Sequence, residues 1–446
     1  MKTYYFLGIG GIGMSAIARY FLLKGDNIFG YDLTRTELTQ ELEKEGMSIV
    51  YEDNIDLLPK DIDMVIYTPA IPKDNTIFNY FLNSNTPILK RSEILAEITK
   101  DKKTIAISGT HGKTTVSTMV AHLLNNSSIG CSAFLGGISK NLNSNFLYNP
   151  NSQYIVVEAD EYDRSFLKLS PYYSVITSID EDHLDIYGEY ENLLEAFREF
   201  ANKTQDDGRL FIKQGLDLEL KEELVSQTYT IRGIEADYFA WNIRNYNSKY
   251  YFDLRTPEKV IYDLCLNYPG IHNIENILVS SAIALKLGVS EDELRKGIES
   301  FSGVRRRFDI RIKTKGFVYI DDYAHHPNEI KSCIESIRDM FPGKKLTGVF
   351  QPHLFSRTRD FADEFARALE GLDEVVLLDI YPAREKPIEN INSKWLLHKI
   401  NKMDKYYSEE DGLLDLLDAL YPEVLLTIGA GNIDKFVGKI EERFSE

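Results

Sequence analysis

The sequence has 446 residues, and this length predicts about three domains at roughly 150 residues each. Hydrophobic residues make up 43% of the chain, which is ordinary for a globular protein with a substantial core. The formal net charge of −18 argues against general nucleic-acid binding, because that function needs a basic surface. Glycine loops and a few local cations can still bind an anionic small molecule.

The cysteines Cys131, Cys265 and Cys333 lie far apart, and no C-x-x-C spacing occurs. This spacing argues against a structural zinc site or a disulfide framework, and it fits a reducing cytoplasm. No apolar run reaches the about 18 residues of a membrane span. The N-terminus also lacks the charged and apolar segments of a signal peptide. We therefore expect a cytoplasmic protein that binds neither membranes nor nucleic acids.

The first stretch of the chain places a glycine loop between a predicted strand, residues 4–7, and a predicted helix, residues 14–23. Gly8, Gly10 and Gly13 fit G-x-G-x-x-G, and the next predicted strand ends in Asp32. In this fingerprint the glycines allow close approach to a pyrophosphate, and the acid accepts from a ribose hydroxyl. The pattern predicts nucleotide or dinucleotide binding. The alternative is a tight turn that binds no ligand.

A second glycine loop follows the predicted strand 104–107 and precedes a predicted helix over 114–124. Glycines let backbone N–H groups surround phosphate oxygens, and the helix N-terminus adds partial positive charge. Lys113 can reach the outer phosphates of a nucleotide, and the Thr114 hydroxyl can bind Mg²⁺. The usual G-x-x-x-x-G-K-[ST] pattern has a glycine where this chain has Ile107. The alternative is again a tight turn without a ligand.

Acidic residues follow the next two predicted strands. Glu158 comes directly after the apolar run 154–157, and an acid at such a position commonly holds magnesium in a phosphate-loop fold. The alternative is that residues 158, 160 and 161 are solvated acids at a strand end. His183 lies in an acidic cluster after the predicted strand 174–179. It is either a surface residue or a further group near Glu158 and the phosphate loop.

The middle of the chain predicts antiparallel strands within residues 226–268, at 238–241, 250–254 and 264–266, followed by a helix over 277–287. Asn273 could cap this helix, and an Asn amide could instead read an adenine edge. Three adjacent arginines at 305–307 suggest that at least one reaches a phosphate or a carboxylate. The alternative for them is a basic surface patch.

Near the C-terminus, four predicted strands at 317–322, 346–350, 374–379 and 424–428 each precede a polar cluster, with helices between them such as 360–369. Alternating strands and helices predict a parallel sheet, and ligands bind at the carboxyl ends of its strands. The fold class is therefore α/β with three domains: a Rossmann-like domain over 1–101, a central ATP-binding phosphate-loop domain over 102–310, and a second Rossmann-like domain over 311–446. We also expect a strand at 87–90 and a helix capped by Ser92 and running to residue 98.

Two separate phosphate loops imply two phosphorylated ligands. The second loop has the pattern of an ATP site, and the first could hold a nucleotide-linked substrate. A third domain with His, Arg and Tyr at its strand ends could complete the ATP site and bring a second substrate. This architecture suits ATP-driven ligation, in which a carboxylate is activated as an acyl phosphate and an amine then attacks it. Lys113, Arg307 and magnesium would neutralise the charge on the transferring phosphoryl group.

Motifs along the whole chain carry a resemblance to a known family. They are the stretches at 8–15, 108–115, 158–161, 182–185, 272–276, 306–308, 321–327, 351–353 and 356–358. In this order they resemble the Mur ligases of peptidoglycan synthesis, and most closely the members that join L-alanine to UDP-N-acetylmuramate. The resemblance implies an ATP-dependent ligase that forms a C–N bond and acts in cell-wall biogenesis, cell shape and cell division.

The resemblance also implies a role for individual residues. The first loop would bind the UDP part of the sugar nucleotide, and not NAD, through Gly8, Gly10, Gly11, Gly13 and Asp32. ATP would be bound by Gly109, Thr110, His111, Gly112, Lys113, Thr114, Thr115, Asn273, Asn276, Arg307, Asp322 and His325. Magnesium would be held by Thr114, Glu158 and His183, and L-alanine by Tyr323, His325, His353 and Arg357. The catalytic residues would be Lys113, Glu158, His183 and Arg307.

Several positions depart from the family pattern. Tyr162 and Arg164 replace a serine and a glycine, Arg384 replaces a glycine, and Asn432 replaces an aspartate. We expect these departures to bear on the fine positioning of the sugar or nucleotide, and not on the reaction class.

Three other functions remain open from the sequence. The first is a recycling ligase that adds a whole tripeptide to the same sugar nucleotide. The second is an NAD-dependent oxidoreductase that uses the first glycine loop, and the third is a non-catalytic nucleotide-binding regulator. For the assembly we expect a monomer or a weak homodimer.

Overall fold

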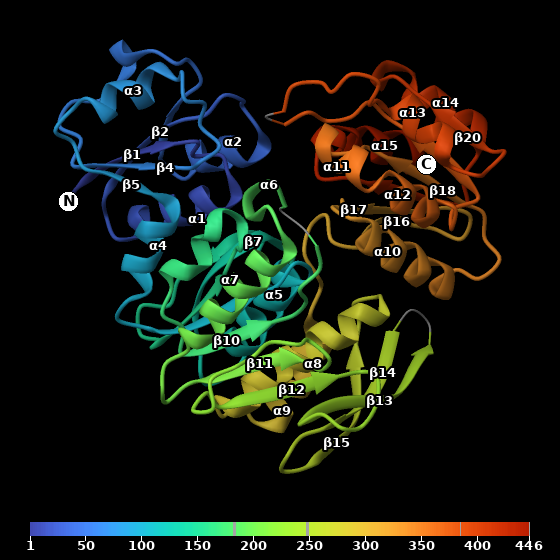
Figure 1. The fold of residues 1–446 in the computed structure, drawn as a ribbon, viewed down its shortest axis with the longest axis horizontal. Helices are drawn as coiled ribbons and strands as arrows, with labels where there is room; N and C mark the ends of the chain where they lie inside the picture. Colours follow the sequence, from blue (N-terminus) through green and yellow to red (C-terminus); the bar gives the residue numbers. More distant parts are fainter. Residues whose placement is uncertain (182–183, 247–248, 384, 446) are drawn as a thin grey trace. The chain divides into compact units, whose positions relative to one another are not determined.

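The computed structural model describes residues 1–181, 184–246, 249–383 and 385–445, whose strands form three sheets (Figure 1). The chain divides into two compact units, and each is described by itself. Unit 1 comprises Met1–Ile243, Tyr251–Cys265 and Glu275–Ser302. Unit 2 comprises Arg244–Tyr250, Leu266–Ile274 and Gly303–Glu446.

The first sheet has five parallel strands in the order β3-β2-β1-β4-β5 (Figure 1). Its strand order reverses at β1, and ligands of open α/β sheets bind beyond the carboxyl ends of the strands at such a point. The glycine loop lies there, between β1 and α1. The elements are β1 (Thr3–Leu7), α1 (Ile12–Leu23), β2 (Asn27–Tyr31), α2 (Glu37–Lys44), β3 (Ser48–Val50), η1 (Ile55–Leu57), β4 (Met64–Tyr67), α3 (Thr76–Leu82), β5 (Ile88–Lys90) and α4 (Arg91–Thr99).

The second sheet has ten strands in the order β15-β14-β13-β12-β11-β10-β6-β9-β7-β8. Neighbours from β13 to β7 are parallel, and β8 adds to β7 as an antiparallel edge. Strand β6, which precedes the second glycine loop, lies between β10 and β9. The polar ends of three neighbouring strands therefore meet at one edge.

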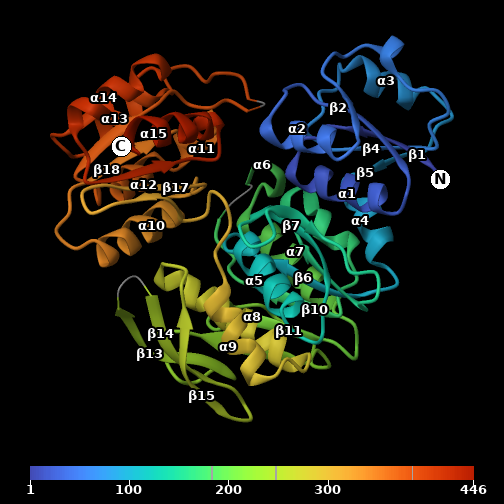
Figure 2. The same ribbon diagram turned by 180° about the vertical axis from the view of Figure 1, so that it is seen from behind.

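The elements around this sheet include α5, which follows β6, and α9, which packs against α5 (Figure 2). The strands are β6 (Lys103–Ser108), β7 (Ser132–Ser139), β8 (Ser144–Leu147), β9 (Tyr154–Glu158), β10 (Tyr173–Ile176), β11 (Arg209–Lys213), β12 (Ser226–Thr230), β13 (Tyr238–Tyr246), β14 (Lys249–Arg255) and β15 (Val260–Leu266). The helices are α5 (Lys113–Asn125), η2 (Tyr162–Lys168), α6 (Leu184–Tyr187), α7 (Tyr190–Asn202), α8 (Ile271–Lys286) and α9 (Glu291–Ser300).

The third sheet belongs to unit 2 and has six strands in the order β16-β17-β21-β18-β19-β20. Only β16 is antiparallel to its neighbour among these strands. The strands are β16 (Asp309–Lys313), β17 (Val318–Asp322), β18 (Leu346–Phe350), β19 (Glu374–Leu377), β20 (Lys405–Tyr407) and β21 (Val424–Ile428). The helices are α10 (Pro327–Met340), α11 (Phe355–Asp360), α12 (Ala362–Leu369), α13 (Ser393–Lys399), η3 (Glu410–Gly412), α14 (Leu413–Leu420), η4 (Asn432–Phe436) and α15 (Val437–Phe444).

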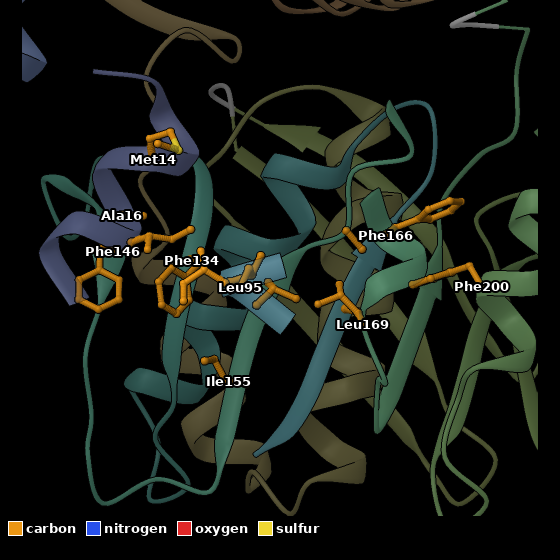
Figure 3. Packing of buried hydrophobic residues seen from close by; sticks show 14 of the residues in the cluster. Met14, Ala16, Leu95, Phe134, Phe146, Ile155, Phe166, Leu169 and Phe200 are labelled. Atoms are coloured by element: carbon orange, nitrogen blue, oxygen red, sulfur yellow. The ribbon is translucent and has the colours of Figure 1, made fainter. Parts of the chain in front are cut away.

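One hydrophobic cluster of unit 1 contains side chains from both of its sheets (Figure 3). Met14 and Ala16 of α1 belong to the same cluster as Phe134 of β7 and Phe146 of β8. Tyr20 of α1 extends this contact, with its ring centroid 5.8 Å from that of Phe134 and 6.3 Å from that of Phe146. The helix that follows the first glycine loop is thus packed onto the second sheet.

Two helix starts differ from the sequence predictions. Helix α4 begins at Arg91, so Ser92 lies inside its first turn and is not its cap; the Glu93 carboxylate instead accepts from the Lys90 N–H at 2.9 Å. Helix α8 begins at Ile271, earlier than predicted, so Asn273 is a helical residue. The Asn273 amide donates to the Pro269 carbonyl, and it does not cap the helix.

The helix predicted over 360–369 is present as α12, which begins at Ala362, and Asp360 is the last residue of α11. The strands predicted at 238–241, 250–254 and 264–266 are present as β13, β14 and β15. Among the described helices, none is both long and apolar enough to cross a membrane.

Candidate active site

The first glycine loop of unit 1 is held to the end of β2. The Gly8 N–H donates to the Tyr31 carbonyl at 2.8 Å, and Gly8 has a φ of +82°, which glycine adopts without strain. The Gly10 N–H donates to the Asp32 carboxylate at 2.8 Å, and a Cβ at Gly10 would lie 2.9 Å from Asp32 Oδ2. One oxygen of Asp32 therefore organises the loop.

The second glycine loop depends on two glycines with positive φ, +129° at Gly109 and +83° at Gly112. A Cβ at Gly109 would lie 2.1 Å from Thr177 Oγ1, so only glycine fits there. Ile107, the departure from the usual phosphate-loop pattern, is a buried residue of β6 that pairs with β9 and β10. The chain still forms a loop that leads directly into α5, whose N-terminus favours anions.

The chain after β10 fixes the tip of this loop. Ser178 Oγ accepts from the His111 N–H at 2.8 Å, and Thr110 Oγ1 accepts from the Asp180 N–H at 3.0 Å. His111 Nε2 lies 2.9 Å from Asp180 Oδ2. Thr110 and His111, both predicted to bind ATP, thus have protein partners that hold the loop in shape.

Lys113 lies at the first position of α5 and turns its ammonium back over the loop. Its Nζ donates to the Gly109 carbonyl at 2.7 Å and to Glu161 Oε1 at 2.9 Å, and the Glu161 side chain is 0% exposed. Burial lowers the pKa of Lys113, but the carboxylates of Glu161, Asp160 and Glu158 outweigh burial and hold it above its usual value. The ammonium therefore remains charged at neutral pH, within the loop where phosphates would bind.

Thr114 and Glu158, predicted as magnesium ligands, lie together. The Thr114 hydroxyl donates to Glu158 Oε2 at 2.8 Å. A Cβ at Gly136 of β7 would lie 1.9 Å from Glu158 Oε2, so this glycine leaves the space that the carboxylate occupies.

This donor set fits Mg²⁺, which prefers hard oxygen ligands and usually binds through one or two carboxylates, water and substrate phosphates. Among the described residues, no group of three or more His, Cys, Asp or Glu could hold a metal by itself. A metal held by Thr114 and Glu158 would thus take its remaining ligands from phosphate and water. His183, the third predicted ligand, lies outside the described residues.

Asn276 and Asn273 were both predicted to bind ATP. In unit 1, a Cβ at Gly112 would lie 3.0 Å from Asn276 Oδ1, so the Asn276 amide lies beside the phosphate loop. Asn273 belongs to unit 2, where it is buried. Thr115, the last predicted residue of the loop, is a buried residue of α5.

In unit 2, Asp322 ends β17 and is buried. Its carboxylate accepts from the Phe308 N–H at 2.6 Å and from the Ala324 N–H at 2.7 Å. Burial raises the pKa of Asp322 to about 6, although Arg307 and these N–H groups favour the charged form. The side chain predicted to serve the nucleotide therefore also fixes the two chain segments on either side of it.

The Tyr323 ring contacts two arginines of the 305–307 run. The guanidinium carbons of Arg306 and Arg307 each lie 4.9 Å from the centroid of its ring. Arg306 is tied down further, because it donates to the Gly429 carbonyl at 2.8 Å. Arg307 lies 4.0 Å from Glu329. The arginines thus form an organised cluster around an aromatic ring.

Of the residues predicted to bind L-alanine, three lie close together. The His325 ring centroid lies 5.6 Å from that of Tyr323 and 6.3 Å from that of His353. Glu329 Oε2 lies 3.4 Å from His325 Nδ1. Arg357 is a buried residue of α11, and its place relative to those three rings stays a prediction.

Three parts of the chain match domains of one known family. Residues 3–103 match the Mur ligase family, catalytic domain, residues 107–284 match the Mur ligase middle domain, and residues 306–431 match the Mur ligase, glutamate ligase domain. The chain belongs to the Mur ligase family.

Individual Mur ligases resemble the chain over its whole length. UDP-N-acetylmuramate–L-alanine ligase of Parabacteroides distasonis is 48% identical, with 98% of this chain and 96% of the relative covered. The ligase of the same name from Christiangramia forsetii is 46% identical over 99% of this chain and 97% of the relative. The crystal structure of UDP-N-acetylmuramate-alanine ligase from Thermotoga maritima has a TM-score of 0.85 and 29% identity, covering 100% of this chain and 99% of that one.

Two departures from the Mur ligase pattern have a structural account. Arg164, where a glycine is usual, has a φ of +53°, a conformation that glycine adopts without strain, and its guanidinium lies 5.4 Å from the Tyr187 ring centroid. Asn432, where an aspartate is usual, accepts from Gln351 Nε2 at 2.8 Å, and a carboxylate would accept the same bond. Arg384 lies outside the described residues, and nothing in the structure explains Tyr162.

Sequence reasoning missed three residues of this Mur ligase site: Glu161, Ser178 and Gly136. Gly136 carried a signal, because a glycine inside a strand often marks the close approach of another group. Glu161 carried no such signal, since nothing in the sequence distinguishes it from the neighbouring Asp160. The structure shows that Glu161 is buried and not solvated. Ser178 binds the loop through a contact that depends on the pairing of β6 with β10.

Proposed function

We propose that this chain is an ATP-dependent ligase that joins L-alanine to the carboxylate of UDP-N-acetylmuramate, in the synthesis of peptidoglycan precursors. The names of its full-length relatives support this activity. The observation that carries the proposal is the phosphate loop itself, where the Thr114 hydroxyl lies 2.8 Å from Glu158 and the Lys113 ammonium lies within the loop.

The reaction would proceed in two steps. A carboxylate oxygen of the sugar nucleotide forms a bond to the γ-phosphorus of ATP, and ADP leaves with the electrons of the broken P–O bond. The amine of L-alanine then forms a bond to the carbonyl carbon of the acyl phosphate, loses a proton, and displaces inorganic phosphate. One ADP and one phosphate thus appear for each amide formed.

The residues of unit 1 supply charge and position for the first step. Lys113 offers a fixed positive charge to the phosphoryl group, and such fixed charges are worth most where water is excluded. The backbone around Gly109 and Gly112 surrounds the phosphates. Thr114 and Glu158 would hold Mg²⁺, which supplies additional positive charge for the phosphoryl group when it is bound.

The other assignments are proposals that follow from the family resemblance. For ATP they are Thr110, His111, Thr115, Asn273, Asn276, Arg307, Asp322 and His325. For L-alanine they are Tyr323, His325, His353 and Arg357, of which Arg357 could pair with the amino-acid carboxylate through two hydrogen bonds. For the sugar nucleotide they are Gly8, Gly10, Gly11, Gly13 and Asp32. His183 is proposed as a ligand of a second magnesium ion and as a catalytic residue. We further propose that the protein acts in the cytoplasm as a monomer or a weak homodimer and binds no nucleic acid.

The alternative functions fit less well. A recycling ligase would need a larger acceptor pocket, and that subfamily has Glu-Pro-Arg and Ser-Asn-Thr where this chain has Gln351-Pro352-His353 and Ser356-Arg357-Thr358. An NAD-dependent oxidoreductase would leave the second glycine loop without a role. A non-catalytic regulator would not need a charged lysine and a paired hydroxyl and carboxylate in the same loop.

The deciding experiment measures phosphate release from ATP with UDP-N-acetylmuramate and Mg²⁺, comparing L-alanine, the tripeptide and no acceptor. We expect release that depends on both the sugar nucleotide and L-alanine, with one phosphate per amide. Faster release with the tripeptide would favour the recycling ligase. A rate of phosphate release that is the same with L-alanine, with the tripeptide and with no acceptor would contradict the proposal.

A second test removes the lysine of the phosphate loop and uses another lysine as its matched control. Lys113→Met should lower turnover at least about 100-fold while changing the Kd for UDP-N-acetylmuramate less than twofold. This change leaves the buried Glu161 without its cation. The double variant Lys113→Met/Glu161→Gln should therefore be as inactive as Lys113→Met, and its melting temperature should be higher than that of Lys113→Met. Lys103→Met, at the other end of β6, should leave turnover unchanged. Active Lys113 variants would exclude the proposed role of the loop.

A further inference from the structure

Arg306 adopts a strained backbone conformation that hydrogen bonds hold at both its N–H and its carbonyl. Its φ is +61°, in the left-handed region that residues other than glycine rarely adopt. The Arg306 N–H donates to the Asp309 carboxylate at 3.2 Å, and its carbonyl accepts from the Tyr323 N–H at 2.7 Å. Such strain persists only where the surroundings enforce it. One of the two bonds that enforce it here reaches a residue proposed to bind L-alanine.

The guanidinium of Arg306 is bound by the protein at each of its nitrogens. Its Nη2 donates to the Gly429 carbonyl at 2.8 Å, and its Nη1 donates to the Asp434 carboxylate at 3.1 Å. Its Nε lies 3.5 Å from Asp321 Oδ2. These oxygens belong to β17, to the residue after β21 and to η4, so one side chain joins three segments of unit 2. The guanidinium is therefore committed to the fold and not to a ligand.

The ring of Tyr323 is the point where Arg306 meets the proposed L-alanine site. The guanidinium carbon of Arg306 lies 4.9 Å from the centroid of that ring, which is a cation–π contact. The backbone hydrogen bond between the same two residues adds a second constraint on Tyr323. The Tyr323 ring centroid in turn lies 5.6 Å from that of His325. Loss of the Arg306 side chain would therefore loosen the Tyr323 ring without removing a group that binds substrate.

We propose that Arg306 is a positioning residue of the amino-acid site, which touches no substrate and acts by holding the Tyr323 ring in place. This inference rests on the proposed function and adds a residue to the roles given there. Removal of the guanidinium should weaken the binding of L-alanine. It should leave the binding of the sugar nucleotide unchanged, because the residues proposed for that ligand belong to unit 1.

Arg338 of α10 provides a matched control in the same unit. Its Nη2 donates to the Gly371 carbonyl at 2.9 Å, and its Nη1 donates to the Lys344 carbonyl at 3.1 Å and to Asp373 Oδ2 at 3.0 Å. Like Arg306, it is thus bound to the backbone and to an aspartate. Its partners precede β18 and β19, at the amino edge of the sheet, whereas ligands bind at the carboxyl edge. Arg338→Gln should therefore cost similar stability without disturbing the amino-acid site.

The first test is the KM for L-alanine, measured by phosphate release from the full-length protein at saturating ATP and UDP-N-acetylmuramate. Arg306→Gln should raise this KM by about tenfold. Arg306→Lys should raise it less, because lysine keeps the charge but not the fork of donors. Arg338→Gln should change it less than about twofold. All three variants should bind UDP-N-acetylmuramate with the Kd of the parent, which also shows that they are folded. Should Arg306→Gln fail to fold, Arg306→Lys carries the same comparison.

A double-mutant cycle tests whether Arg306 acts through the ring. Tyr323→Ala removes the ring, so the further change Arg306→Gln should raise the KM for L-alanine little beyond that of Tyr323→Ala alone. The two changes are then non-additive, as expected for residues in contact.

Two results would overturn the inference. One is a KM for L-alanine in both Arg306 variants that equals that of the parent. The other is a double variant in which the separate effects of Arg306→Gln and Tyr323→Ala multiply, because Arg306 would then act independently of the ring. A parent protein whose phosphate release does not depend on L-alanine would instead contradict the proposed function itself, so the two failures are distinguishable.

Discussion

Asp321 shows how a single buried carboxyl makes stability depend on pH. It lies in β17, accepts from Thr427 Oγ1 at 2.7 Å, and has Arg306 Nε 3.5 Å away. Burial nevertheless raises its pKa to about 6, since the loss of hydration outweighs both partners. The folded carboxyl thus binds its proton more tightly than the unfolded one, whose pKa is near 3.9.

The consequence is a loss of stability as the pH rises through these two pKa values. Asp321→Asn cannot ionise, so its free energy of unfolding relative to the parent should rise by about 2 kcal/mol between pH 4 and pH 7. Urea unfolding at pH 4, 5, 6 and 7 measures this difference. A difference that stays constant with pH would show that folding does not raise the pKa of Asp321.

Lys113 shows which contacts of a single residue can be predicted from the sequence and which cannot. Its place in a phosphate loop could be predicted, because Gly-Lys-Thr between a strand and a helix has few other uses. Its pairing with Glu161 could not, because that contact requires β6 and β9 to be neighbours in the sheet. Asp322 is similar: its position after a strand was predictable, and its two backbone hydrogen bonds were not.

At the scale of elements, helix α1 is fastened to strand β8 by a buried polar contact. Asn145 of β8 is 0% exposed, and its amide donates to Ser15 Oγ at 2.9 Å and to the Ile12 carbonyl at 2.5 Å. Its carbonyl accepts from Arg19, which is buried and also pairs with Glu45 at 2.6 Å. The contact therefore holds the turn that carries the first glycine loop.

Asn145→Ala should lower the free energy of unfolding by about 2–3 kcal/mol, because it leaves buried donors and acceptors without partners. Asn151→Ala, at an exposed position before β9, should change it by less than about 0.5 kcal/mol. Urea unfolding of both variants provides the comparison. Equal stability of the two would mean that water replaces Asn145 at this contact.

For the whole molecule, most strands could be predicted, because buried parallel strands are continuous apolar runs in the sequence. The polar clusters after them could also be predicted, because ligands of a parallel sheet bind at the carboxyl ends of its strands. Helix starts were less certain. The first turn of α8 has no strong signal, since Asn273 reads equally well as a cap and as a helical residue. Contacts between sheets, such as Arg91 with Asp160, depend on the fold and could not be read from spacing. The domain boundaries at 101 and 310 stay predictions.

The central claim is that the two glycine loops bind two different ligands. Its most direct measurement is the titration of a non-hydrolysable ATP analogue with Mg²⁺ into the protein, with and without saturating UDP-N-acetylmuramate. The account predicts one site for each compound, binding of both together, and loss of the analogue alone in Lys113→Met. Competition between the two compounds, or loss of both in that variant, would contradict it.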